Sequence, residues 1–252
     1  MQHQYISHVM KKVFQLSDLS MIRMINHLFG KEYADDEDVI RYWKDEKIIR
    51  IVVSIGCVDQ YTFYIRYLDD IPQIYIKEEG CAFYYRDAVS RSALQMRSHE
   101  AGFFGENRKE EYIMNLNFAG YERVTLSVRT YVLTDCSARK LEEEGLILFL
   151  PLLFCCFKEK NENAEIKREV LKYFIFHDIL GALHDSMKKG DLSVYDVQKL
   201  KQLCGYMAWK LLLDVKWMQS LELQELLMEA FCTDIELLER AHQRELDDVR
   251  NK

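Results

Sequence analysis

Alternation of apolar and polar positions predicts two β-hairpins in the first half of the chain. In the first, residues 48–55 and 61–68 flank a short polar turn at Val58, Asp59 and Gln60. Both runs are rich in the β-branched and aromatic side chains that favour strands. In the second, residues 114–118 and 123–133 flank a turn at 119–122 that contains Gly120. The first half is therefore predicted to form a sheet.

A change to helical spacing predicts an amphipathic helix before the first hairpin. Between residues 21 and 29, apolar side chains recur three or four positions apart. Ser17 or Asp18 can accept hydrogen bonds from the first free backbone N–H groups, and Gly30 is placed to end the helix. An acidic run at 35–38 follows, and its position beside a helix end is typical of a solvated loop.

Three further segments are predicted between the two hairpins. Residues 71–76 favour an edge strand or an extended connection, because Pro72 lacks the N–H group that a central strand needs. Residues 81–96 favour a helix, and residues 99–109 favour a polar loop that contains glycine.

The second half of the chain has helical periodicity. Ser137 can cap a helix that continues into the apolar run 146–157, and residues from 164 onward are predicted to be wholly helical. A second helix is expected to begin near Ser193, with Asp196 three residues on, and a third near Leu221. The first of these three helices ends at Gly190, and its apolar stripe is expected to consist of Ile166, Val170, Phe174, Leu180, Leu183 and Met187.

Composition narrows the class of protein. The 252 residues are 49% hydrophobic and carry a formal net charge of −7, so the overall charge does not attract the chain to nucleic acid or anionic lipid. The longest apolar run has about a dozen residues and contains Pro151, which is short of the roughly 20 that span a bilayer. Seven cysteines without a CxxC pair favour reduced thiols. We therefore expect a cytoplasmic α/β protein without a membrane partner.

No residue pattern of a common catalytic site occurs in the chain. His177 and His184 are seven residues apart, about 10 Å along a helix axis, which is too far for both to hold one ion unaided. They are interpreted as ordinary histidines. Cys136, Cys204 and Cys232 have no histidine at a suggestive spacing, so nucleophilic catalysis has no support.

Three segments, in order, carry a resemblance to a known family: MIRMINHLFGKEYADDEDV at 21–39, LEEEGLILFLPLLFCCFKEK at 141–160 and KKGDLSVYDVQKLKQLCGYMAWKLL at 188–212. Together with the order of predicted elements, they resemble the PD-(D/E)XK nuclease family transposases, the Rpn-type recombination-promoting nucleases of bacteria. The resemblance covers about residues 7–230. It implies a restriction-endonuclease-like core, a small mixed sheet flanked by helices, over residues 1–160, with a helical C-terminal extension over 161–252.

The resemblance also implies where a metal site would lie. The family's catalytic hairpin carries an aspartate on its first strand and E-x-Q or E-x-K on its second, because Mg²⁺ requires oxygen ligands beside the scissile phosphate. Aligned with that pattern, the aspartate falls on Val53 and the E-x-Q falls on Arg66 to Leu68, while an upstream acidic position falls near Ser7. We therefore expect no catalytic residues, no metal and no cofactor, and interpret the chain as a degenerate member that acts by binding.

Several alternatives remain open. Arg66 could replace the metal as a fixed charge that binds phosphate, together with Arg86, Arg91 and Arg97, or it could simply form a salt bridge. An active Mg²⁺-dependent DNA endonuclease would require relocated acids, for which Asp59, Asp69 and Asp70 are the candidates. The expected partners are DNA, a second copy of the chain, or an active relative that this chain regulates.

Overall fold

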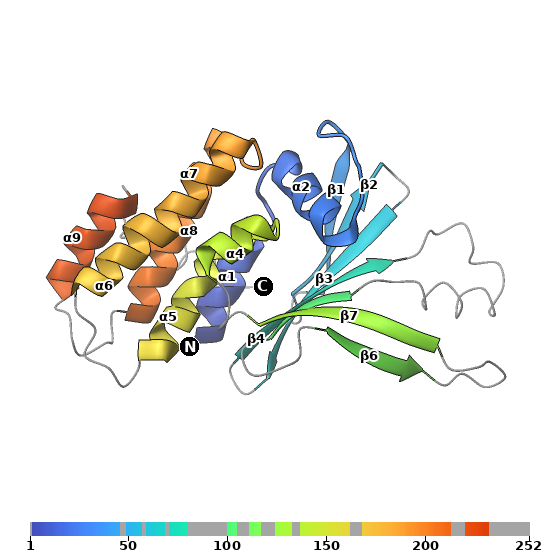
Figure 1. The fold of residues 1–252 in the computed structure, drawn as a ribbon, viewed down its shortest axis with the longest axis horizontal. Coiled ribbons are helices and arrows are strands. Elements are labelled where there is room, and N and C mark those ends of the chain that lie inside the picture. Colours follow the sequence, from blue (N-terminus) through green and yellow to red (C-terminus); the bar gives the residue numbers. More distant parts are fainter. Residues whose placement is uncertain are drawn as a thin grey trace, which may run out of the picture. The chain divides into compact units, whose positions relative to one another are not determined.

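The computed structural model describes residues 2–45, 49–56, 59–68, 71–79, 100–104, 111–116, 124–132, 137–161, 168–212 and 220–231 (Figure 1). The chain is a mixed α/β protein, as predicted. It divides into two compact units, a helical unit from residues 1–20 and 137–252 and a sheet unit from residues 21–136. The boundary expected at residue 160 falls inside the helical unit, which groups residues 137–160 with the C-terminal helices.

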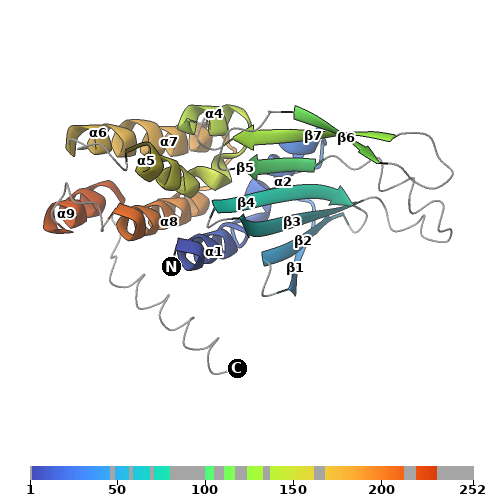
Figure 2. The same cartoon turned by 90° about the horizontal axis from the view of Figure 1, so that it is seen from below.

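The sheet unit contains seven described strands in the spatial order β1-β2-β3-β4-β5-β7-β6 (Figure 2). Neighbouring strands are antiparallel except β5 and β7, which run parallel, so the sheet is mixed. The strands are β1 (Val39–Asp45), β2 (Ile49–Ile55), β3 (Asp59–Leu68), β4 (Ile71–Glu79), β5 (Glu100–Phe104), β6 (Glu111–Leu116) and β7 (Val124–Val132).

Both predicted hairpins are confirmed. β2 pairs with β3 from Ile49↔Ile65 to Ile55↔Asp59, and β6 pairs with β7. The prediction of a turn at Val58, Asp59 and Gln60 is wrong for the last two residues, which already belong to β3, and Val58 lies outside the described residues. The chain turns earlier, at Gly56, whose φ of 58° lies in the left-handed region that glycine adopts readily.

Two predictions between the hairpins are wrong. β4 is an inner strand rather than an edge, because β3 pairs with it on one side and β5 on the other. Pro72 is tolerated there since the pairing with β5 begins only at Ile74. Residues 100–104, predicted as part of a loop, form β5, which gains hydrogen bonds from both β4 and β7. The helix expected at 81–96 lies outside the described residues.

Helix α2 (Asp18–Phe29) matches its prediction at both ends. Ser17 Oγ accepts a hydrogen bond from the Ser20 backbone N–H at 3.3 Å, so Ser17 is a side-chain cap at the start of the helix. Gly30 follows the last residue with a φ of 61°, which ends the helix.

The helical unit places α1 (Gln2–Val13) against α8 (Val194–Leu212), which is also in contact with α5, α7 and α9 (Figure 1). The other elements of this unit are α4 (Ala138–Glu143), the 3₁₀ helix η3 (Ile147–Leu152), α5 (Leu153–Asn161), α6 (Arg168–Tyr173), the π-helix η4 (Phe174–Ile179), α7 (Leu180–Lys189) and α9 (Ser220–Phe231). Leu200, Met207 and Leu211 of α8 are buried in the core of the unit.

Two helix predictions in this unit are wrong in detail. Ser137 caps α4 as predicted, but α4 stops before Gly145, whose φ is 62°, and Pro151 lies in a separate 3₁₀ helix. The stripe predicted through Val170 is out of register, because Val170 is 49% exposed while Leu171, Ile175 and Ile179 are buried. The π-helix causes the shift, since its wider turns use more residues than the 3.6-residue period assumes.

Across the part of the chain that the structure describes, no helix is both long and apolar enough to cross a membrane.

Candidate functional site

Val53 lies at the hairpin position where the family resemblance expects an aspartate. It sits in β2, opposite Tyr61 of β3 and Arg41 of β1, with strand neighbours on both sides. Its side chain is 0% exposed, and Ile51 and Ile55 on the same face of the strand are buried as well. This position belongs to the apolar core of the sheet unit.

The two other family positions lie on β3. Arg66 pairs with Gln73 and Leu68 pairs with Ile71, both on β4. Residues 66 and 68 share a strand face, as their spacing of two predicts. The structure does not describe the side chain of either residue, so the phosphate-binding role of Arg66 stays a prediction.

Of the three acids considered as candidates for a relocated site, Asp59, Asp69 and Asp70, the structure describes Asp59. It begins β3, and its Oδ2 accepts a hydrogen bond from the hydroxyl group of Tyr33. The same hydroxyl lies 2.7 Å from that of Tyr61, whose side chain is fully buried. Glu37 also reaches the hairpin turn, because its Oε2 lies 3.3 Å from where a Cβ on Gly56 would be. Two carboxylates therefore flank the turn.

A metal site at this hairpin has no complete set of ligands among the described residues. Nowhere in those residues do three His, Cys, Asp or Glu side chains gather as they would to hold one ion. Asp69, Asp70, Arg86, Arg91 and Arg97 lie outside the described residues. Ser7 is half-buried on α1 and belongs to the helical unit, whereas Val53 belongs to the sheet unit.

The helical unit contains a fully buried carboxylate that accepts four hydrogen bonds. Asp196 Oδ1 accepts from the Ser17 backbone N–H at 2.9 Å. Its Oδ2 accepts from the hydroxyls of Ser17, Ser20 and Ser193, the last two at 2.7 Å each. Burial alone would raise the pKa of Asp196, but these hydrogen bonds outweigh it and hold the pKa below the ordinary value of 3.8. We call this set, Ser17, Ser20, Ser193 and Asp196, the serine–aspartate clip.

The sequence predicted only one part of the clip, the contact between Ser193 and Asp196. Ser193 and Asp196 have the spacing of a helix cap, and the Asp196 backbone N–H does donate to Ser193 Oγ at 3.1 Å. Nothing in the sequence links them to Ser17, which is 179 residues away. Four hydrogen bonds from protein groups hold the buried carboxylate, so we interpret the clip as a contact between helices rather than a reactive acid.

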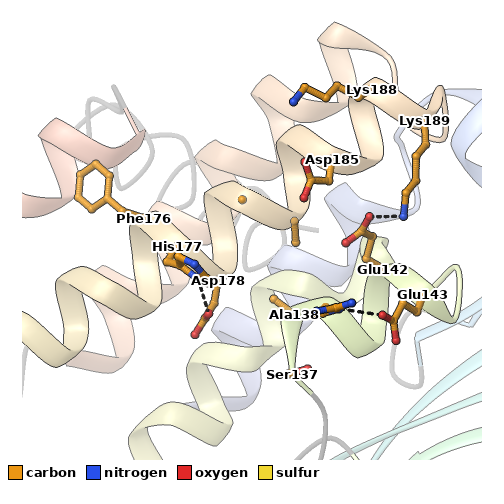
Figure 3. Close-up of a pocket in the computed structure, with 13 residues that line it drawn as sticks. Ser137, Ala138, Glu142, Glu143, Phe176, His177, Asp178, Asp185, Lys188 and Lys189 are labelled. Atoms are coloured by element: carbon orange, nitrogen blue, oxygen red, sulfur yellow. Dashed lines mark hydrogen bonds and ion pairs between the residues drawn. The ribbon is translucent and has the colours of Figure 1, made fainter.

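A groove of about 770 Å³ opens between α4 and the segment formed by η4 and α7 (Figure 3). Two ion pairs border it, Lys189 Nζ with Glu142 Oε1 at 2.6 Å and Arg139 Nε with Glu143 Oε1 at 2.8 Å. The hydrogen bond to Glu142 raises the pKa of Lys189. Sequence reasoning missed this groove, which depends on how two helices face each other.

The two histidines differ in their relation to the groove. His177 lines it, stacks on the ring of Tyr173 at a centroid distance of 4.5 Å and lies 3.2 Å from Asp178 Oδ1. His184 is exposed and is not among the lining residues. Cys204 is fully buried, and burial raises the pKa of its thiol, so it offers no thiolate for catalysis.

Comparisons of the chain with protein-family models, with curated proteins and with solved structures find no match.

Proposed function

We propose that this chain is a degenerate, non-catalytic relative of the PD-(D/E)XK nuclease family transposases and that it acts by binding. The proposal combines the resemblance of three segments and their order with the chemistry of the hairpin. It includes the restriction-endonuclease-like core that the resemblance implies, and it needs no metal ion or other cofactor.

The observation that carries the proposal is the burial of Val53. A metal ligand must expose an oxygen atom to the ion and to the water that the ion activates. Val53 offers no oxygen atom, and its side chain is 0% exposed within a three-stranded antiparallel region formed by β1, β2 and β3. A site lacking this ligand has lost the group that the family pattern places on the first strand.

Two kinds of partner fit a binding role. DNA would be held by Arg66 with Arg86, Arg91 and Arg97, which supply cations for phosphate. A second copy or an active relative would be held by protein contacts, which the net charge of −7 does not oppose. Salt separates the two: binding to duplex DNA falls steeply with ionic strength because phosphate contacts release counterions.

A cleavage assay tests the loss of catalysis. Supercoiled plasmid is incubated with the wild-type chain and Mg²⁺ or Mn²⁺, beside a variant in which Asp59, Asp69 and Asp70 are all replaced by Ala. The proposal predicts the same background of nicking in both samples. Metal-dependent cutting by the wild-type chain that disappears in the variant would overturn it.

A second candidate function is an active Mg²⁺-dependent DNA endonuclease with relocated carboxylates. The observation in its favour is that Asp59 and Glu37 flank the first hairpin turn, beside Gly56. In this case Asp69 and Asp70 would supply further oxygen ligands. In the same plasmid assay, metal-dependent cutting by the wild-type chain would support this second function. The single variants Glu37→Gln and Asp59→Asn would then each lose activity.

A further inference from the structure

The groove of the helical unit exists because small residues line the facing sides of α4 and α7. Ala138 on α4 and Gly181 and Ala182 on α7 all line it. A Cβ built on Gly181 would meet no atom within 4 Å, so the space above this glycine is open. The groove is thus a property of the folded helices themselves, and a larger residue at 181 would occupy it.

Besides the two paired glutamates of α4, two aspartates from η4 and α7 line the groove. Glu142 and Glu143 are neutralised by Lys189 and Arg139. Asp178 on η4 and Asp185 on α7 line the groove as well, and neither has a lysine or arginine within ion-pair distance in the described ranges. Asp178 Oδ1 has a histidine neighbour, the Nδ1 of His177 at 3.2 Å. The spacing of seven residues between the two aspartates corresponds to roughly 10 Å along the helix axis. A ligand lying along the groove therefore meets two carboxylates in succession.

We infer that this groove is a docking site for a basic peptide segment of a protein partner, with two lysine or arginine side chains about 10 Å apart. Two cations at that spacing would each face one carboxylate, Asp178 or Asp185, which has no lysine or arginine within ion-pair distance among the described residues. The small residues allow the backbone or short side chains of the segment to approach the groove closely. The ion pairs at Glu142 and Glu143 border the site without competing for the ligand.

Lys188 carries a positive charge that opposes the attraction of Asp178 and Asp185 for a basic ligand. It also lines the groove, three residues after Asp185, and it has no ion-pair partner among the described residues. It repels the same cations that Asp178 and Asp185 attract. Removal of its charge should therefore strengthen binding, whereas removal of the aspartate charges should weaken it.

The inference concerns the helical unit and does not depend on what the hairpin has lost. The full chain is titrated into a fluorescent, alanine-rich helical peptide with two arginines seven residues apart, and into a control peptide with glutamine at both positions. We expect saturable binding of the first peptide only. Asp178→Asn with Asp185→Asn should weaken it about tenfold, whereas Lys188→Gln should tighten it about threefold.

Two variants separate docking in the groove from general attraction to acidic protein. Gly181→Leu fills the groove without changing the charge and should abolish binding, while Gly181→Ala should bind as the wild type does. Glu222→Gln with Glu225→Gln removes two exposed charges on α9 and should leave the affinity unchanged. Circular dichroism spectra confirm that each variant remains folded.

Three results would overturn the inference. One is the absence of saturable binding to the arginine peptide, and another is an equal loss of affinity in the Glu222 and Glu225 control. The third is displacement of the peptide by spermidine at the same concentration as by unlabelled peptide, which would mean that any polyamine satisfies the two carboxylates. None of these results bears on plasmid cleavage, so the proposed function stands or falls separately.

Discussion

Asp196 and Val53 occupy equally buried positions, one in each unit, and show what a buried site demands of a carboxylate. Both side chains are 0% exposed. Asp196 is charged and is held by four hydrogen bonds from three serines, whereas Val53 lies beside the buried Ile51 and Ile55 on one face of β2. A carboxylate persists inside this protein where donors surround it. Val53, at the position where the family resemblance expects a metal ligand, is part of the apolar core instead.

The largest effect is expected from placing a carboxylate at the hairpin position. Val53→Asp should lower the free energy of unfolding by about 4 kcal/mol, because it buries a carboxylate beside Ile51, Ile55 and Tyr61, and we expect Arg41 on the other neighbouring strand to compensate only part of that cost. Val53→Ala, which only removes two methyl groups, should cost about 2 kcal/mol. Urea denaturation measures both. Equal stability of the two variants would show that the position has access to water or to hydrogen-bond donors after all.

The converse change removes the carboxylate from the serine–aspartate clip. Asp196→Ala should cost about 3 kcal/mol of unfolding free energy, since the buried hydroxyl of Ser20, the part-buried hydroxyls of Ser17 and Ser193 and the Ser17 N–H all lose their acceptor. Glu225→Ala on the exposed face of α9 is the matched control and should change stability by less than about 0.5 kcal/mol. A loss at Asp196 no larger than the control would contradict the role of the clip.

Acid should weaken the clip in a defined direction. The pKa of Asp196 lies below 3.8 in the folded protein, so the folded state binds this proton less readily than the unfolded state does. The resulting stability is fully present above the unfolded value and is lost as the pH falls through the folded value. Measured by urea denaturation from neutral pH downward, the stability advantage of the wild type over Asp196→Asn should shrink only below about pH 4. If the advantage of the wild type grows in acid instead, the pKa of Asp196 is raised rather than lowered by folding, which contradicts the prediction.

The smallest change in stability is expected from removing the Tyr33 hydroxyl, which contacts Asp59 and Tyr61 at the hairpin turn. Tyr33→Phe removes that hydroxyl and should lower the unfolding free energy by about 1 kcal/mol, as expected for a part-buried hydrogen bond. Tyr173→Phe, on an exposed side chain, should leave stability unchanged. Thermal unfolding followed by circular dichroism distinguishes the two. If both variants unfold at the wild-type temperature, the Tyr33 hydroxyl does not stabilise the turn.

Local patterns in the sequence predicted the elements that local interactions determine. The ends of α2 followed from Ser17 and Gly30, and both hairpins followed from alternation. The inner position of β4 and the existence of β5 were not predicted, because both depend on pairing between distant strands. The phase of the buried face on α6 was missed since the π-helix η4 breaks the 3.6-residue period.

The candidate sites divide in the same way. The sequence itself shows that Val53, Arg66 and Leu68 lack the oxygen ligands of the family pattern. The complete burial of Val53 could not be predicted, because it depends on β1 and β3 pairing with β2 on either side. The clip joins Ser17 to Asp196 across 179 residues, and the groove arises between α4 and α7. The clip and the groove both depend on contacts between segments that are distant in the sequence, so local periodicity does not predict them.

The central claim, that the hairpin no longer holds a catalytic metal, is tested most directly by crystals of the protein soaked in Mn²⁺, with anomalous scattering recorded at the manganese edge. We predict no anomalous peak within ligand distance of a side chain in β2, β3 or the turn between them. A peak coordinated by Asp59 together with Asp69 or Asp70 would contradict it and would establish a relocated nuclease site.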